Sequence, residues 1–212
     1  LLFRGEYKNY MACNTEYHDL AHTLDALLAC ARLMDGRNLS GNPFSLQLAS
    51  ELLLATLLHD TGYIQKNDDL SGTGAKYTAS HVERSIEFVK LNMNDFGIEP
   101  SSLDVVGRLI ACTGLRNRWE DFNFNDTDEM IAGTILATAD LLGQMSDRAY
   151  LEKLLFLYYE FREAGIEGYN TEFDILRKTL DFYEITQTRL ETTLKGSYLY
   201  AAVHFAVRRE IN

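Results

Sequence analysis

Residues 46–58 constrain the fold more than any other segment, because they are apolar around almost the whole circumference of a helix. Pro43 and Ser45 precede the segment as helix-start signals, and His59 and Asp60 follow it. The apolar run is shorter than the roughly 20 residues that cross a bilayer. We therefore expect a helix at the centre of a folded domain. Its apolar character comes from Leu46, Leu48, Leu52, Leu53, Leu54, Leu57 and Leu58.

Helical patterns continue along the rest of the sequence. Start and stop signals predict further helices at about 15–35, 80–95, 101–112, 126–144, 147–164, 172–194 and 197–209. No stretch shows the strict alternation of a β-strand over a useful length. We therefore predict an all-α fold, a compact multi-helix bundle with one domain over 1–212. Its core is expected at 14–145, with additional C-terminal helices at 147–209.

The charge of the chain limits its partners. The 212 residues carry a formal net charge of −11, with 46% hydrophobic and 24% charged residues. This charge disfavours duplex nucleic acid, whose phosphates select clustered Lys and Arg, but a bound cation can still attract a small phosphorylated substrate. The first residues lack the basic start and apolar length of a signal peptide. Cys13, Cys30 and Cys112 match no zinc motif, so we expect reduced thiols and a cytoplasmic location.

Two histidines and an aspartate recur at helical spacing in the segment Tyr17-His18-Asp19-Leu20-Ala21-His22-Thr23-Leu24-Asp25. On one continuous helix, His18, His22 and Asp25 share a face. Nearby leucines suggest that this face points inward, where imidazoles and a carboxylate need partners or a metal. The alternative is a pair of hydrogen-bonded helix histidines, and the spacing alone does not separate the two interpretations.

Two further polar features interrupt apolar helices. His59 and Asp60 end the most apolar helix, and a carboxylate at a helix C-terminus opposes the helix dipole unless a cation relieves the conflict. Asp140 lies within the apolar stretch 135–142, and facing inward it would also require a cation. The alternatives are a C-terminal histidine favoured by the dipole and an aspartate on an exposed face. Imidazole and carboxylate ligands together suit one or two divalent ions of Mg, Mn, Fe or Zn.

The order His22, His59-Asp60, Asp140 resembles the H…HD…D signature of the HD superfamily of metal-dependent phosphohydrolases. The segment from Tyr17 to Asp25 is similar to the Y-H-N-x-x-H-x-x-D segment of class I cyclic-nucleotide phosphodiesterases. Residues 109–113 and 138–141 are similar to later helices of that family, so the resemblance covers roughly residues 14–145.

The resemblance implies a role for each of these residues. His22, His59, Asp60 and Asp140 would bind the first metal, and Asp60 would also act in catalysis, facing a second metal and the attacking water. His18 would be the general acid that protonates the leaving oxygen. His81 would lie near a second metal or the substrate phosphate, although a solvent-facing histidine at a helix start is the alternative. The implied activity is phosphoester hydrolysis, with a cyclic or linear nucleotide among the substrates to consider.

The sequence also departs from the family pattern. Asp19 stands where the phosphodiesterases usually carry Asn, and their substrate-binding Gln has no assigned counterpart. Tyr63 and the lack of a GYP motif disfavour cyclic-di-GMP hydrolases. Two other functions stay open, a non-catalytic HD domain that senses or binds partners and an alarmone or nucleotide hydrolase. The aromatic residues beyond position 150 are interpreted as core or homodimer contacts, and Arg116, Asn117, Arg118 and Trp119 as either the rim of a pocket or a solvated loop.

Overall fold

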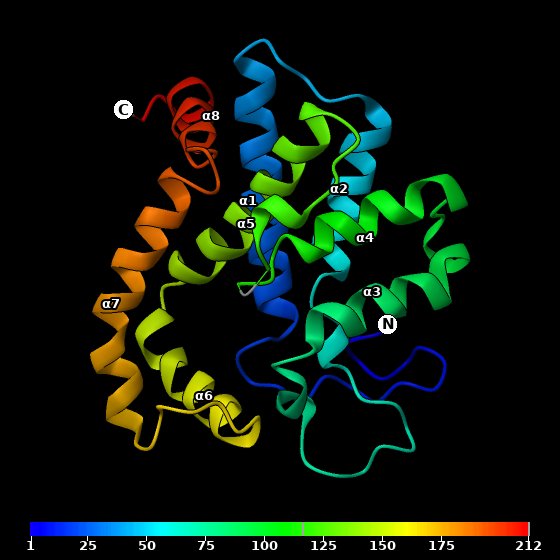
Figure 1. Ribbon diagram of the computed structural model, residues 1–212, viewed down its shortest axis with the longest axis vertical. Helices are drawn as coiled ribbons and strands as arrows, with labels where there is room; N and C mark the ends of the chain where they lie inside the picture. Colours follow the sequence, from blue (N-terminus) through cyan, green and yellow to red (C-terminus); the bar gives the residue numbers. More distant parts are fainter. Residues whose placement is uncertain (116, 212) are drawn as a thin grey trace.

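The computed structural model describes residues 1–115 and 117–211 and confirms the all-α prediction (Figure 1). Within these residues the only β-type pairings are two isolated bridges, Arg4 with Ala12 and Tyr10 with Lys66. The α-helices are α1 (Leu20–Leu39), α2 (Leu46–Leu58), α3 (His81–Asn92), α4 (Leu103–Ala111), α5 (Thr127–Met145), α6 (Tyr150–Glu163), α7 (Glu172–Glu191) and α8 (Leu199–Arg209).

Capping side chains explain where several of these helices begin. Ser45 accepts a hydrogen bond from the Leu48 amide at the start of α2, and Asp126 accepts one from Glu129 at the start of α5. The predicted start of the first helix at about residue 15 is wrong. Asp19 caps α1 through the amide of His22, so the helix begins at Leu20 and His18 lies outside it.

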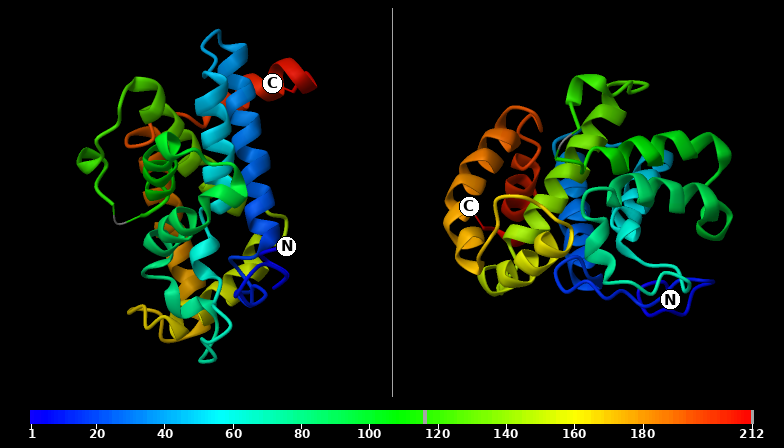
Figure 2. Two further views of the ribbon diagram at one scale, coloured as in Figure 1. Left: turned by 90° about the vertical axis from the view of Figure 1, so that its right-hand side faces the viewer. Right: turned by 60° about the horizontal axis from the view of Figure 1, so that its bottom comes forward.

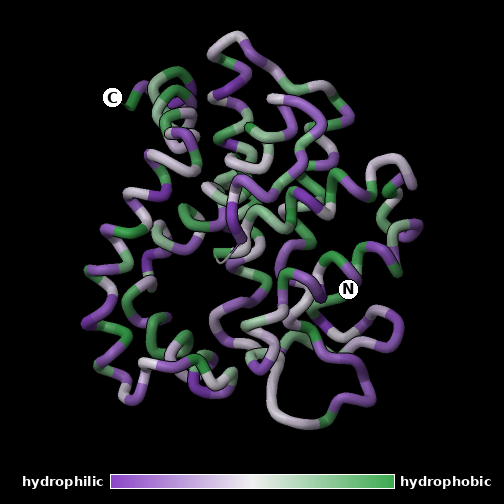
Figure 3. The backbone as a smooth tube through the Cα atoms, viewed as in Figure 1, coloured by the Kyte–Doolittle hydropathy of each residue, from purple (hydrophilic) through white to green (hydrophobic). Residues whose placement is uncertain are grey.

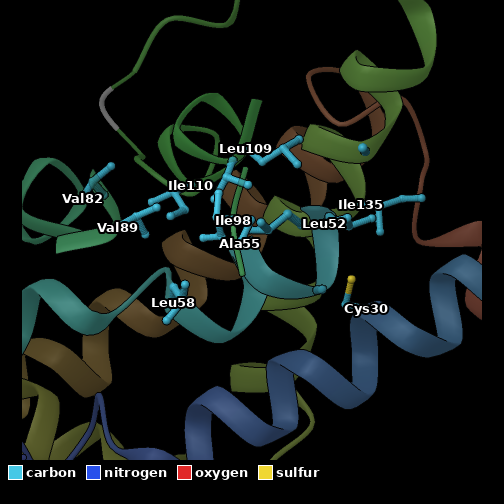
Figure 4. Packing of buried hydrophobic residues seen from close by; sticks show 14 of the residues in the cluster. Cys30, Leu52, Ala55, Leu58, Val82, Val89, Ile98, Leu109, Ile110 and Ile135 are labelled. Carbon is cyan, nitrogen blue, oxygen red and sulfur yellow. The ribbon is translucent and has the colours of Figure 1, made fainter. Parts of the chain in front are cut away.

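The main core forms where α1, α2, α3, α4 and α5 meet (Figure 4). Cys30, Leu52, Ala55, Val89, Leu109 and Ile135 are fully buried there and come from all five helices. The expectation that α2 is buried all round is only partly met, because Leu46 is 88% exposed and Leu57 is 37% exposed. The inner side of α2 nevertheless fixes His59 and Asp60 at its end in the interior of the protein.

Two parts of the C-terminal region pack differently. α8 returns to lie against α1, whereas α6 and α7 form a hairpin beside the core (Figures 1 and 2). α6 also contacts the short helical turn Gly74–Tyr77, far away in the sequence. The cavity described below lies between this hairpin and the core.

Apolar residues are dispersed along every helix rather than collected into one long apolar segment (Figure 3). Across residues 1–115 and 117–211, no helix combines the length and hydropathy that a membrane crossing requires. The three cysteines are unpaired, and Cys30 and Cys112 are buried.

Gly36 provides a test of the packing between α1 and α8. A Cβ atom at Gly36 would lie 1.8 Å from the backbone oxygen of Tyr200, so alanine must displace α8. We expect Gly36→Ala to lower the free energy of unfolding by about 1–3 kcal/mol through overpacking. Each kcal/mol lost should lower the Tm by about 2–4 °C. Calorimetric melting would measure the change.

Gly107→Ala is the matched control within a helix. A Cβ atom at Gly107 meets only Ile86 Cγ2, at an ordinary distance of 3.5 Å. Its better helix propensity should leave stability unchanged or raise it by up to about 1 kcal/mol. Equal Tm values for Gly36→Ala and the unmodified protein would contradict the packing described for α8.

Candidate metal centre and adjoining cavity

Three helices bring two histidines and two aspartates to one point. His22 lies in the first turn of α1, His59 and Asp60 follow α2, and Asp140 lies in α5. His22 Nε2 is 3.3 Å from Asp60 Oδ2 and 3.0 Å from Asp140 Oδ1. His59 Nε2 is 3.4 Å and 3.5 Å from the same two oxygens. We call these four residues the His–Asp cluster.

The His–Asp cluster has the donor set and spacing of a cation site. Nitrogen and oxygen ligands about 2.0–2.2 Å from a tetrahedral ion lie about 3.4 Å apart, and the four nitrogen–oxygen distances in the cluster are 3.0–3.5 Å. His59 Nε2 and Asp60 Oδ2 are buried and have no hydrogen-bond partner among the described residues. His59 Nδ1 donates to the Thr56 carbonyl over 2.7 Å, which leaves the Nε2 lone pair directed at the cluster. Within residues 1–115 and 117–211, His22, His59 and Asp60 meet the geometry of a metal-binding group.

Burial and mutual charge shift the pKa values of the cluster in opposite directions. Burial lowers the pKa of His22, but its contacts with Asp140 and Asp60 outweigh this and raise the pKa to about 10. Burial raises the pKa of Asp60, yet the nearby imidazoles of His59 and His22 hold it well below the usual range of a carboxyl. The pKa of Asp140 is lowered by His22 and His59 in spite of its burial. Both carboxylates are therefore held in the charged form, Asp60 in the interior and Asp140 with a side chain that is 25% exposed.

His81 faces the second oxygen of Asp60. Its Nε2 lies 3.8 Å from Asp60 Oδ1, and its Nδ1 donates to the Thr78 carbonyl over 2.8 Å. The first turn of α3 approaches the turn Thr61–Tyr63 so closely that a Cβ at Gly62 would lie 1.9 Å from the His81 oxygen. His81 is thus directed at the site rather than at solvent, with a side chain that is 22% exposed. Burial lowers its pKa, against the opposing charge of Asp60.

His18 reaches the same region from the segment before α1. The expected shared helix face of His18, His22 and Asp25 is wrong, because only His22 and Asp25 are helical. His18 Nδ1 lies 2.6 Å from Oε2 of Glu160, a residue of α6. Glu160 Oε1 also accepts the amide of Tyr17 over 2.8 Å, so one buried carboxylate holds both the ring and the backbone.

Three rings stack beside the cluster. The Tyr63 ring packs against both His18, at 4.3 Å between centroids, and His81, at 4.6 Å, and the two imidazole centroids are 6.2 Å apart. The Tyr63 side chain is 2% exposed, so this stack fixes both histidine rings in place. Burial raises the pKa of the Tyr63 hydroxyl, and the charge of Asp60 adds to the effect. Tyr63 should therefore stay neutral at physiological pH.

A cavity of about 390 Å³ opens from the His–Asp cluster toward α6 and α7. Its volume is in the range of small-molecule sites. His18, His22, Asp60, His81 and Asp140 line one end. The opposite wall is built from α6, α7 and the connection between them.

Sequence reasoning missed Glu160 and the structural role of Tyr63. Glu160 lies in an amphipathic helix among other charged residues, and no local pattern separates it from a solvated glutamate. Only its burial, at 4% exposure, distinguishes it. Tyr63 directly follows the His59–Gly62 segment. Its position next to the two predicted ligands His59 and Asp60 was the sequence feature that could have indicated a role at the site.

Of the other residues considered from the sequence, some line the cavity and others lie away from it. Asn117 lines the cavity, but Arg118 is exposed and pairs with Glu120. Trp119 packs against Phe122 and Phe124, and Arg116 lies outside the described residues. His204, expected to be an ordinary helix histidine, pairs with Asp35 at 2.7 Å on the surface.

The fold and this site define an all-α protein with a buried histidine–aspartate cluster beside a ligand-sized cavity. The model of the Npun_R2479-like family matches residues 66–201, and the chain belongs to that family. The match includes His81, Asp140 and Glu160, whereas His18, His22, His59 and Asp60 precede it. No curated protein and no solved structure matches the chain.

The His–Asp cluster predicts a defined effect on metal binding. We expect His59→Ala and Asp60→Ala to abolish binding of Mn²⁺ or Zn²⁺, because each removes a ligand that no neighbour replaces. Titration calorimetry would measure affinity, with circular dichroism to confirm the fold. His204→Ala removes a histidine distant from the cluster and should bind metal normally. Full metal retention by folded Asp60→Ala would disprove the assignment.

Proposed function

We propose that this protein is a metal-dependent phosphohydrolase that cleaves a small phosphoester. The observation that carries the proposal is the His–Asp cluster at one end of a ligand-sized cavity, with a third histidine, His18, on the same wall. Four nitrogen and oxygen donors suit a divalent ion. Such an ion, when bound, supplies activation of a water nucleophile and neutralisation of phosphate charge.

The charges in the cavity support a role for the cation in substrate binding. Asp60, Asp140 and Glu83 line it, and Lys178 is the one Lys or Arg among its described lining residues. Without a cation, the carboxylates would repel a phosphate. A substrate anion and a metal are therefore expected to bind together, which links the ligand set directly to phosphate chemistry.

His18 is the group proposed to donate a proton to the leaving oxygen. Because its Nδ1 is held by Glu160, its Nε2 is the free ring atom for this transfer. The contact with the Glu160 carboxylate fixes the orientation of the ring. The Tyr63 ring behind His18 prevents it from turning away. Glu160 acts here as a positioning residue.

His81 and Asp60 extend the proposal to the other side of the cluster. Asp60 Oδ2 faces His22 and His59, while Asp60 Oδ1 faces His81. His81 Nε2 has a free lone pair because Nδ1 donates to Thr78. We assign His81 to a second metal ion or to the substrate phosphate. A cytoplasmic location and a homodimer remain predictions that accompany this function.

Hydrolysis of bis-p-nitrophenyl phosphate would test the proposal. We expect turnover with Mn²⁺ and its loss on chelation. His18→Ala should retain metal affinity and lower kcat for an alkyl phosphoester by roughly two to four orders of magnitude, because it removes the general acid that an alkoxide leaving group needs. A metal-free, inactive protein would instead favour the non-catalytic sensor or interaction module.

A double-mutant cycle would test the role of Glu160. We expect Glu160→Gln to lower kcat roughly tenfold or more, with metal affinity and KM little changed, because the amide holds the His18 ring less well. In the His18→Ala background the same substitution should have no further effect on kcat. Glu163→Gln, on the same helix but bonded to Thr73, is the control. Independent, additive losses would contradict the coupling.

A further inference from the structure

The wall of the cavity opposite the His–Asp cluster is apolar. Leu154 and Leu157 come from α6, and Ile175 and Phe182 come from α7. Leu141 of α5, which follows Asp140 in the sequence, also lines the cavity. Leu154 and Ile175 are 3% and 4% exposed, so they form a fixed wall rather than a mobile fringe. Three residues around the α6–α7 connection continue this surface: Phe161, Ile166 and Tyr169.

Most polar groups along this wall already have partners inside the protein. The hydroxyl of Thr179 donates to the Ile175 carbonyl over 2.8 Å, and that of Thr113 donates to Ile110 over 2.8 Å. The side-chain amides of Gln144 and Asn117 donate to Tyr17 and to the Ala111 carbonyl. Each of these groups therefore has one donor hydrogen already engaged within the protein.

Few polar groups remain for recognition. Lys178 Nζ donates to the Gly168 carbonyl over 2.6 Å and lies 4.3 Å from the Tyr169 ring centroid. Tyr150 and Tyr169 add two hydroxyls to the lining. A nucleobase carries several donors and acceptors, and on this wall most of them would lose water without gaining a partner.

We propose that the alcohol portion of the substrate is apolar, an alkyl or similar hydrocarbon group rather than a nucleoside. This inference rests on the proposed function and names its substrate class. The phosphate would occupy the end at the His–Asp cluster, and the hydrocarbon would cover the wall formed by α6 and α7. Burial of apolar surface supplies the affinity without any directional contact.

The chemistry stays that of hydrolysis. The oxygen of water bonds to phosphorus and its proton passes to solvent, while the bond between phosphorus and the alcohol oxygen breaks. His18 gives its proton to that oxygen and regains one from solvent, so the products are the free alcohol and the phosphate with one ester bond fewer. The leaving oxygen is an alkoxide in character and needs this proton, which agrees with the position of His18 on the cavity wall.

Binding of octyl phosphate and of adenosine 5′-monophosphate to the Mn²⁺-loaded protein would test the inference. We expect octyl phosphate to bind at least tenfold more tightly in titration calorimetry. Phe182→Gln should weaken octyl phosphate roughly tenfold or more, because it places an amide on the apolar wall. Ile185→Gln is the matched control, since Ile185 lies on the same helix, is 66% exposed and does not line the cavity.

The outcomes separate this inference from the proposed function. Equal or tighter binding of adenosine 5′-monophosphate, or unchanged octyl phosphate affinity in folded Phe182→Gln, overturns the inference even if bis-p-nitrophenyl phosphate is hydrolysed. A clear octyl preference that Phe182→Gln removes supports the inference. If that preference occurs without metal-dependent hydrolysis, the proposed function fails while the apolar specificity of the cavity stands.

Discussion

Two carboxylates that face two imidazoles at the junction of three helices are the constraint on which the rest of the structure depends. Asp60 is buried and Asp140 is partly exposed, and the imidazoles of His22 and His59 are the groups close enough to offset their charge. Buried charge of this kind is costly unless its partners are held accurately. The packing of α1, α2 and α5 against one another holds these side chains in position. The geometry of the site therefore depends on the packing of the core.

The fold and the positions of the cluster were largely predictable from the sequence. Apolar periodicity and the signals at Ser45, Asp126 and Gly97 located most helices to within a few residues, because local capping decides those boundaries. The start of α1 was misplaced because Asn14 and Asp19 are both good caps. Asn14 instead bonds to Gln65 and Gly74, tertiary partners that no local pattern specifies.

The long-range contacts of the site were not predictable in the same way. Nothing in the sequence near Glu160 indicates a partner 142 positions earlier in the chain. The ring stack of His18, Tyr63 and His81 likewise joins three separate segments. Periodicity describes which side of a helix is buried, whereas such contacts depend on how the helices are placed against one another.

The His–Asp cluster and the apolar wall of the cavity come from different segments of the chain. The His–Asp cluster comes entirely from α1, α5 and the end of α2, whereas the wall that would receive the substrate's alcohol comes mainly from the hairpin. Under the proposed function, substitutions in the hairpin would alter substrate preference while the proposed cation ligands stay unchanged. Glu160 limits that freedom, because it belongs to the hairpin and its carboxylate holds both the His18 ring and the Tyr17 amide.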